Sequence, residues 1–161
     1  MIKYLIIIFC LLFVSQENIV SSKEQKKIGK VTGLEIPRFV SLKKSKTFLR
    51  RGPGKSYKID WILERNNYPL MIIAEHEHWR QVVDFQGDIG WVYFRLLSGN
   101  RTLIVSKDDI FLRKKENNDS DPIGILKYGV VGELIESTEN ACNAKFKNLS
   151  GWTNKNDVWG C

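Results

Sequence analysis

Aromatic side chains are the first candidates for chemistry in this sequence, because flat rings bind ligands by stacking. Tyr57, Trp61 and Trp79 lie within one stretch of the chain and are interpreted as candidate ligand contacts. An exposed ring gives a large contact area at low entropic cost, as in sites that hold sugars or peptides. Trp91 and Trp152 each follow a glycine and are interpreted as structural anchors beside a close backbone approach. For the first three, the alternative is that the rings belong to the core.

A local cluster of cations adjoins these rings. Arg50 and Arg51 are followed closely by Lys55 and Lys58. Such a cluster could bind carboxylates, anionic lipid head groups or an acidic protein. The alternative is ordinary solvated charge. We take Arg50 and Arg51 as candidate ligand contacts together with the aromatic residues.

A tight turn is predicted beside the two arginines. Pro53 presets its own φ, and Gly54 tolerates a positive φ, so the segment favours a type II turn. Gly52, Pro53 and Gly54 are therefore predicted to have structural roles.

Candidates for catalysis or metal binding are few. His76 and His78 would share one face of a strand, but the chain contains only two histidines and a closed metal site needs further ligands. The segment 75–78 therefore favours a polar hairpin turn. No motif near Cys142 would activate a thiolate as a nucleophile. We predict no catalytic residue, no metal, no cofactor and no enzymatic activity.

The elements that must position these residues are short. Apolar runs of four to seven residues alternate with turn formers such as Gln86-Gly87-Asp88 and Ser98-Gly99-Asn100. No stretch sustains a helical period over 12 or more residues. Short β-rich runs separated by turn signals indicate an all-β barrel or sandwich.

The chain partly matches itself at an offset of 61–63 residues. Phe48-Leu49-Arg50-Arg51 aligns with Phe111-Leu112-Arg113-Lys114, Trp61 with Ile123, and Gly90-Trp91 with Gly151-Trp152. The match predicts two tandem small barrels, one over residues 32–98 and a degenerate one over residues 103–161, with a joint at 98–102. The second unit lacks a tryptophan that matches Trp79.

Length and composition fit this organisation. The chain has 161 residues, 43% hydrophobic and 11% aromatic, which excludes a disordered or collagen-like protein. It has 25 Lys and Arg against 18 Asp and Glu, a net charge of +7. Two domains of this size lie near the lower limit for a self-sufficient core. The excess of basic residues favours anionic partners. The sequence contains no nucleic-acid recognition motif, and we predict no nucleic-acid binding.

The N-terminus predicts export. Lys3 precedes an apolar run over residues 5–14, which is too short to cross a bilayer but typical of a secretory signal. We predict a cleaved signal peptide over residues 1–22 and a basic lead over 23–31, with no transmembrane span after cleavage and a periplasmic or secreted location. The alternatives are an uncleaved anchor or a lipoprotein attached through Cys10.

Cleavage would leave two cysteines, Cys142 and Cys161, in an oxidising compartment. An even count there favours a disulfide between them. The alternative is two free thiols, because sequence does not show whether the Cβ atoms meet.

An ordered set of motifs resembles a family of bacterial SH3-like (SH3b) domains. The set comprises the runs 33–43 and 49–54, then Trp79-Arg80, Gly90-Trp91-Val92 and the closing Val158-Trp159-Gly160. The resemblance implies small β-barrels in an exported protein of a Gram-negative, alphaproteobacterial cell. It also implies binding to cell-wall material or envelope proteins, without catalysis. Relatives often carry a second cysteine shortly before the position of Cys142, and residues 137–140 contain none.

The combined prediction is a non-catalytic binding module of the bacterial cell envelope that contacts peptidoglycan. The alternatives are a periplasmic protein–protein adaptor that uses an SH3-like groove or a strand edge, or a structural envelope protein without a defined ligand. The sequence leaves open the oligomeric state and whether the two barrels dock rigidly.

Overall fold

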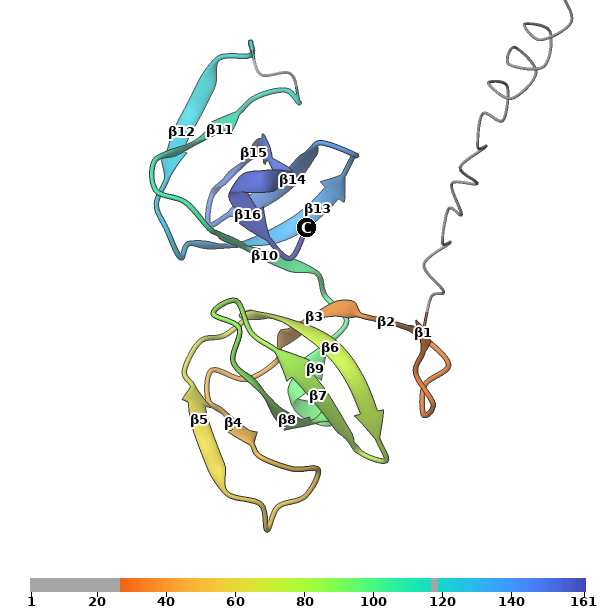
Figure 1. The fold of residues 1–161 in the computed structure, drawn as a ribbon. Coiled ribbons are helices and arrows are strands. Elements are labelled where there is room, and N and C mark those ends of the chain that lie inside the picture. The colour runs from red at the N-terminus through yellow and green to blue at the C-terminus, as the bar shows by residue number, and fades with distance from the viewer. Residues whose placement is uncertain (1–26, 117–118) are drawn as a thin grey trace, which may run out of the picture.

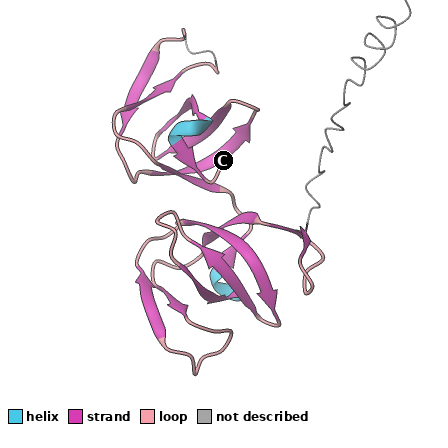
Figure 2. Ribbon diagram, in the orientation of Figure 1, coloured by secondary structure: helices cyan, strands magenta, loops and turns pink. Residues whose placement is uncertain are grey.

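The computed structural model describes residues 27–116 and 119–161 (Figure 1). The described chain consists of strands and turns with two short 3₁₀ helices, η1 (Phe94–Leu96) and η2 (Lys155–Asp157) (Figure 2). The predicted signal peptide, its cleavage site and Cys10 lie outside the described residues.

The strands form two seven-stranded antiparallel sheets with the same strand order. The first barrel contains β3 (Arg38–Leu42), β4 (Thr47–Arg50), β5 (Ile59–Leu63), β6 (Pro69–His76), β7 (Trp79–Val83), β8 (Ile89–Tyr93) and β9 (Leu97–Ser98), in the order β5-β4-β8-β7-β6-β3-β9. The second barrel contains β10 (Thr102–Val105), β11 (Ile110–Arg113), β12 (Pro122–Leu126), β13 (Val131–Ser137), β14 (Ala141–Phe146), β15 (Leu149–Asn154) and β16 (Val158–Trp159), in the order β12-β11-β15-β14-β13-β10-β16. The predicted all-β fold of two small SH3-like barrels is confirmed.

A third, two-stranded sheet precedes the first barrel. It pairs β1 (Lys27–Ile28) with β2 (Glu35–Ile36), and Figure 1 shows it projecting from the side of that barrel. We call residues 27–36 the N-terminal ribbon. The sequence predicted a basic lead over residues 23–31 and placed residues 32–36 in the first barrel, because strands of two residues carry no readable periodicity.

Strand alternation builds a separate core in each barrel. In β4, Thr47 and Leu49 are buried, while Phe48 is exposed between them. The same pattern recurs in β11, where Ile110 and Leu112 are buried on either side of exposed Phe111. Successive strand side chains point to opposite faces, so each hairpin gives one face to the core and the other to the outside.

Each core is a compact cluster of mainly aliphatic residues. The first contains Ile36, Val40, Leu42, Leu49, Leu70, Ile72, Val82 and Val92. The second contains Leu103, Val105, Ile110, Leu112, Leu126, Cys142, Ala144, Phe146 and Val158.

A disulfide ties the end of the chain to the second core. Cys142, fully buried in β14, is bonded to Cys161, with 19 residues of sequence separation and a Cα–Cα distance of 6.2 Å. Closing a loop of this size contributes about 3 kcal/mol to stability.

The two barrels contact each other directly. Trp159 of the second barrel lies with its ring centroid 4.8 Å from that of Phe39 and 6.1 Å from that of Phe85 in the first barrel. The Thr102 hydroxyl donates a hydrogen bond to the Asn67 carbonyl at 2.8 Å. Arg101 lies over the Phe39 ring, with its guanidinium carbon 5.4 Å from the centroid. These contacts seat the C-terminal strand against the first barrel.

Two details of the sequence interpretation are wrong. Trp61 pairs with Leu49 and Gly124 with Leu112, so Trp61 corresponds to Gly124 and not to Ile123. The turn is not type II, because Gly54 does not have a positive φ. Its N–H instead donates to the Gly52 carbonyl at 2.9 Å.

Packing against Tyr57 explains this turn. A Cβ on Gly52 would lie 2.4 Å from the Tyr57 ring, and one on Gly54 would lie 3.2 Å from it. The glycines are therefore required by the close approach of a ring.

No helix in the described ranges is long and apolar enough to cross a membrane.

Candidate functional site

The outer face of the first barrel carries a continuous group of aromatic and apolar side chains. In the sheet, Phe48 pairs with Ile62, Arg50 with Trp91, and Tyr93 with Trp79. Their chain neighbours Leu49 and Val92 are fully buried and Arg80 is nearly so, and alternation therefore directs this group away from the core. We call the group the aromatic face, and it comprises Phe48, Arg50, Ile62, Trp79, Trp91 and Tyr93.

The rings of the aromatic face contact one another edge to face. The centroid of Trp79 lies 5.7 Å from that of Tyr93 at an interplanar angle of 65°, and Tyr93 lies 5.2 Å from Phe94. His78 stacks on Phe94 at 5.8 Å, which extends the cluster to the turn between β6 and β7. Trp79 and Tyr93 are only half-buried, so part of each ring is available to a ligand.

Arg50 adds positive charge to this face. Its Nη1 donates a hydrogen bond to the Tyr57 carbonyl at 2.8 Å, and its guanidinium carbon lies 5.7 Å from the Phe48 ring centroid. Among the described residues no carboxylate pairs with it. A guanidinium has five N–H donors, so Arg50 keeps donors for an anionic ligand.

The other predicted contacts lie elsewhere on the β4–β5 hairpin. Arg51 forms an ion pair with Asp60, with Nε 2.6 Å from Oδ1. Tyr57 covers the glycine turn and leaves 49% of its surface exposed. Trp61 is 52% exposed but lies opposite the core residue Leu49, on the other side of the hairpin from Phe48. The structure therefore groups Arg50 with Trp79 on one face of the sheet and separates Trp61 from them.

Trp91 belongs to this face, although we predicted a purely structural role for it. It is half-buried in β8, with its ring 6.4 Å from that of His76. The close approach belongs to the preceding glycine, since a Cβ on Gly90 would lie 3.0 Å from the Arg50 carbonyl oxygen.

Sequence reasoning missed Phe48, Ile62 and Tyr93. The available signal was strand alternation, since Tyr93 stands two residues after Trp91 and Phe48 two before Arg50. The cross-strand register that joins them is not visible in one sequence.

The second barrel has a cavity at the corresponding place. Its pair Ala141–Asn154 occupies the position of Trp79–Tyr93. The cavity has a volume of about 360 Å³ and is lined by Phe111, Arg113, Glu116, Asn140, Ala141, Trp152, Thr153, Asn154 and Asp157. Trp152, which we predicted as an anchor, is half-buried and forms part of this lining.

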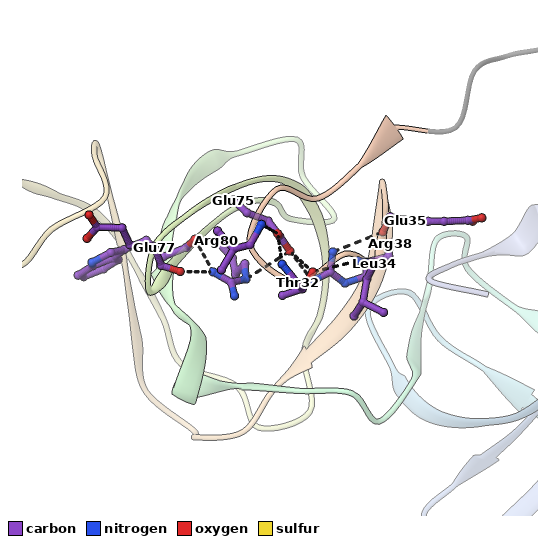
Figure 3. A network of polar contacts seen from close by, with 9 residues as sticks. Thr32, Leu34, Glu35, Arg38, Glu75, Glu77 and Arg80 are labelled. Atoms are coloured by element: carbon purple, nitrogen blue, oxygen red, sulfur yellow. Dashed lines mark hydrogen bonds and ion pairs between the residues drawn. The ribbon is translucent and has the colours of Figure 1, made fainter.

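A buried carboxylate supports the first barrel beside the aromatic face. Figure 3 shows Glu75 between Arg80 on one side and Thr32 and Arg38 on the other. The Glu75 side chain is fully buried, and Oε1 lies 2.8 Å from Arg38 Nη2 and 3.6 Å from Arg80 Nε. Sequence analysis assigned Glu75 to a polar turn, but it lies in β6, and the turn itself is Glu77–His78.

The Glu75 carboxylate also holds the N-terminal ribbon. Backbone N–H groups of Val31 and Thr32 each donate to Oε2 at 3.0 Å, and the Thr32 hydroxyl donates to Oε1 at 2.7 Å. Burial by itself would raise the pKa of Glu75, but hydrogen bonds from Thr32 and Arg38 outweigh it and lower the pKa to about 2. Glu75 is therefore ionised and links the ribbon to β6.

Arg80 connects this network to the aromatic face. It is almost fully buried, and its Nη1 donates to the carbonyls of Glu77 and Trp79, both at 2.9 Å. These hydrogen bonds fix the turn from which Trp79 begins β7. No group of three or more His, Cys, Asp or Glu within the described ranges is arranged to hold a metal.

Residues 43–99 match the family model of the bacterial SH3 domain. This segment is therefore similar to the bacterial SH3 domain family. It includes β4 to β9 and therefore the whole aromatic face.

Solved structures resemble the chain only weakly. They include NlpC2 and NlpC1 from Trichomonas vaginalis, with TM-scores of 0.36 and 0.36, identities of 8% and 7%, and coverage of 76% and 81% of this chain. An NlpC/P60 family protein from Bacillus cereus ATCC 10987 has a TM-score of 0.34 and 12% identity over 75% of this chain. The chain spans about half the length of these proteins, 48%, 48% and 55% respectively. No curated protein matches the sequence.

Proposed function

We propose that the protein is a non-catalytic binding module of the bacterial cell envelope, and that its aromatic face contacts peptidoglycan. The observation that carries this proposal is the row of partly open rings, Trp79, Tyr93 and Trp91, beside the guanidinium of Arg50, which pairs with no carboxylate of the described residues. The bacterial SH3 domain supplies the fold on which this face is built.

The chemistry of the face suits a polymer of sugars and acidic peptides. Aromatic rings stack on the apolar faces of sugars, and a guanidinium forms charge-assisted hydrogen bonds with carboxylates. The net charge of +7 adds long-range attraction to an anionic polymer. A periplasmic or secreted location, reached through the predicted signal peptide, would bring the protein to this polymer.

Co-sedimentation with purified sacculi tests the proposal. The chain from residue 23 is titrated at low and physiological salt, beside a Trp79→Ala variant whose fold is checked by circular dichroism. Trp61→Ala is the matched control, because it removes an exposed tryptophan from the other side of the hairpin. We expect saturable retention at physiological salt that Trp79→Ala weakens and Trp61→Ala leaves unchanged.

Two results would contradict peptidoglycan binding. The first is the absence of saturable retention at physiological salt, which would reduce any binding at low salt to unspecific charge attraction. The second is an equal loss in both variants, which would separate retention from the aromatic face.

A second candidate function rests on the free edge of β5. This strand ends the sheet of the first barrel, and none of its residues is buried. An edge strand offers unpaired N–H and C=O groups to an extended peptide, and Trp61 and Ile62 would provide side-chain contacts. Such an adaptor would co-purify with a protein partner even after the glycan is digested.

A further inference from the structure

A cleft lies where the two barrels meet. It has a volume of about 250 Å³ and is lined by Ile62, Leu63, Glu64, Arg65, Tyr68, Asp84, Phe85, Gln86, Ile104, Tyr128 and Gly129. Both barrels contribute to it, because Ile104, Tyr128 and Gly129 belong to the second. We call it the inter-barrel cleft.

Aromatic rings form walls of the inter-barrel cleft. The ring centroids of Phe85 and Tyr128 lie 5.6 Å apart across the two barrels, and Tyr68 is half-buried beside them. The backbone N–H of Tyr128 donates to Asp108 Oδ1 at 3.1 Å, which fixes the loop that carries it. The Tyr128 side chain is about half exposed, so the cleft is open on that side.

Two charges of opposite sign line the same cleft. Asp84 is only 4% exposed, and its Oδ1 accepts hydrogen bonds from the backbone N–H groups of Gln86 and Asp88 at 2.8 and 2.9 Å. Arg65 is exposed. Neither forms an ion pair with any described residue, whereas Glu64 pairs with Lys46 at 3.1 Å.

Both charges act on the Tyr68 hydroxyl. Burial and then the negative charge of Asp84 raise the pKa of Tyr68 to about 12, while the positive charge of Arg65 opposes the rise. Asp84, Arg65 and Tyr68 all line the inter-barrel cleft, so the two charges flank the space in which a single small ligand would lie.

We propose that the inter-barrel cleft binds a free α-amino acid with an apolar side chain. Arg65 holds the carboxylate, Asp84 attracts the ammonium group, and Phe85 and Tyr128 flank the side chain. The volume lies below the roughly 300–1,000 Å³ of ordinary small-molecule sites, so it suits one amino-acid unit. This site shares only Ile62 with the aromatic face, and the proposal does not depend on peptidoglycan binding.

Heteronuclear NMR of the full mature chain tests the proposal with leucine as the probe. D- and L-leucine are titrated separately at physiological salt, beside N-acetyl-leucine and leucine amide. We expect one or both enantiomers to shift the amide signals of Arg65, Gln86 and Tyr128. Removing either charge of the ligand should weaken binding about tenfold, as expected for loss of one charge-assisted contact.

Two charge variants assign the roles. Arg65→Gln should abolish the preference for leucine over leucine amide, and Asp84→Asn should abolish the preference for leucine over N-acetyl-leucine. Asparagine keeps an oxygen that can accept the two backbone hydrogen bonds, so the turn is preserved. Lys44→Gln and Asp121→Asn, at exposed positions outside the cleft, are the matched controls.

The proposal is overturned if neither enantiomer shifts the cleft signals at millimolar concentration. It is equally overturned if both charge variants bind leucine as tightly as the unaltered chain. If Asp84→Asn does not fold, Arg65→Gln alone decides, because its side chain is exposed.

Discussion

The two barrels use one cross-strand position for two different anchors. In the first barrel Glu75 pairs with Arg80, and in the second Ser137 pairs with Cys142 at the corresponding place. Glu75 holds the N-terminal ribbon through an ionic network, whereas Cys142 holds the C-terminus through a disulfide. The same scaffold position thus secures a terminal segment of the chain in each barrel, by unrelated chemistry.

The outer faces of the two barrels also share a scaffold position but differ in the side chains around it. Both barrels retain an arginine over a phenylalanine, at 5.7 Å for Arg50 and Phe48 and 5.4 Å for Arg113 and Phe111. Beside this shared pair the first barrel carries rings and the second a polar cavity. The backbone and the arginine are common to both, so any difference in ligand arises from a few side chains on one fold.

The largest effect is expected when the disulfide that anchors the C-terminus is removed. Cys161→Ala removes the disulfide and should destabilise the second barrel by about 3 kcal/mol. Hydrogen exchange resolved by residue should show lost protection in β14 and β16, with β6 and β7 much less affected. Equal loss of protection in both barrels would show that they unfold as one unit.

Glu75→Gln breaks the ionic anchor. It removes the charge that accepts hydrogen bonds from Thr32 and Arg38, at an expected cost of about 2 kcal/mol. Exchange at the Val31 and Thr32 amides should accelerate while the second barrel is unchanged. Glu139→Gln, at an exposed position, is the control. Unchanged exchange at these amides would contradict the anchoring role.

The same anchor predicts a pH dependence confined to the first barrel. The pKa of Glu75 is lowered to about 2 in the folded chain, so its stabilising contribution is complete above its ordinary pKa of 4.5. It is lost as the pH falls from there through about 2. The Val31 and Thr32 amides should lose protection over this range, relative to those in β14. Parallel loss in the Glu75→Gln variant would assign the effect to other carboxylates.

Much of this architecture could be predicted from the sequence. Of the two anchors, however, only the disulfide was predicted, and the Glu75 network was not. The two cysteines that would remain after the predicted cleavage favour a bond by their number alone, whereas nothing near Glu75 indicates that it is buried. Its partners Thr32 and Arg38 are 43 and 37 residues away. Likewise, spacing indicated the strands that carry Trp79 and Arg50, but only the register shows that Trp61 lies on the other side of its hairpin.

Retention by sacculi should fall about thirtyfold when a ring is lost from the outer face of the first barrel, and it should not change for the second. Trp79→Ala removes a ring from the aromatic face, and loss of such a contact costs on the order of 2 kcal/mol where it is central to binding. Trp152→Ala alters the corresponding face of the second barrel and should leave retention by sacculi unchanged. Equal effects would mean that both barrels bind the same polymer.

The smallest effect concerns the feature that both barrels share. Arg50→Gln and Arg113→Gln each remove one positive charge and one hydrogen bond to a carbonyl, that of Tyr57 or Ser120. If the rings beside Arg50 decide where the polymer binds, Arg50→Gln should weaken retention a few-fold and reduce its salt dependence, because one exposed ionic contact contributes little. Arg113→Gln removes the same charge at the corresponding position of the second barrel, but Arg113 lies beside a polar cavity. This variant should therefore change neither the retention nor its salt dependence. An equal effect of both variants at all salt concentrations would instead indicate attraction by net charge, since that attraction does not depend on which barrel loses the charge.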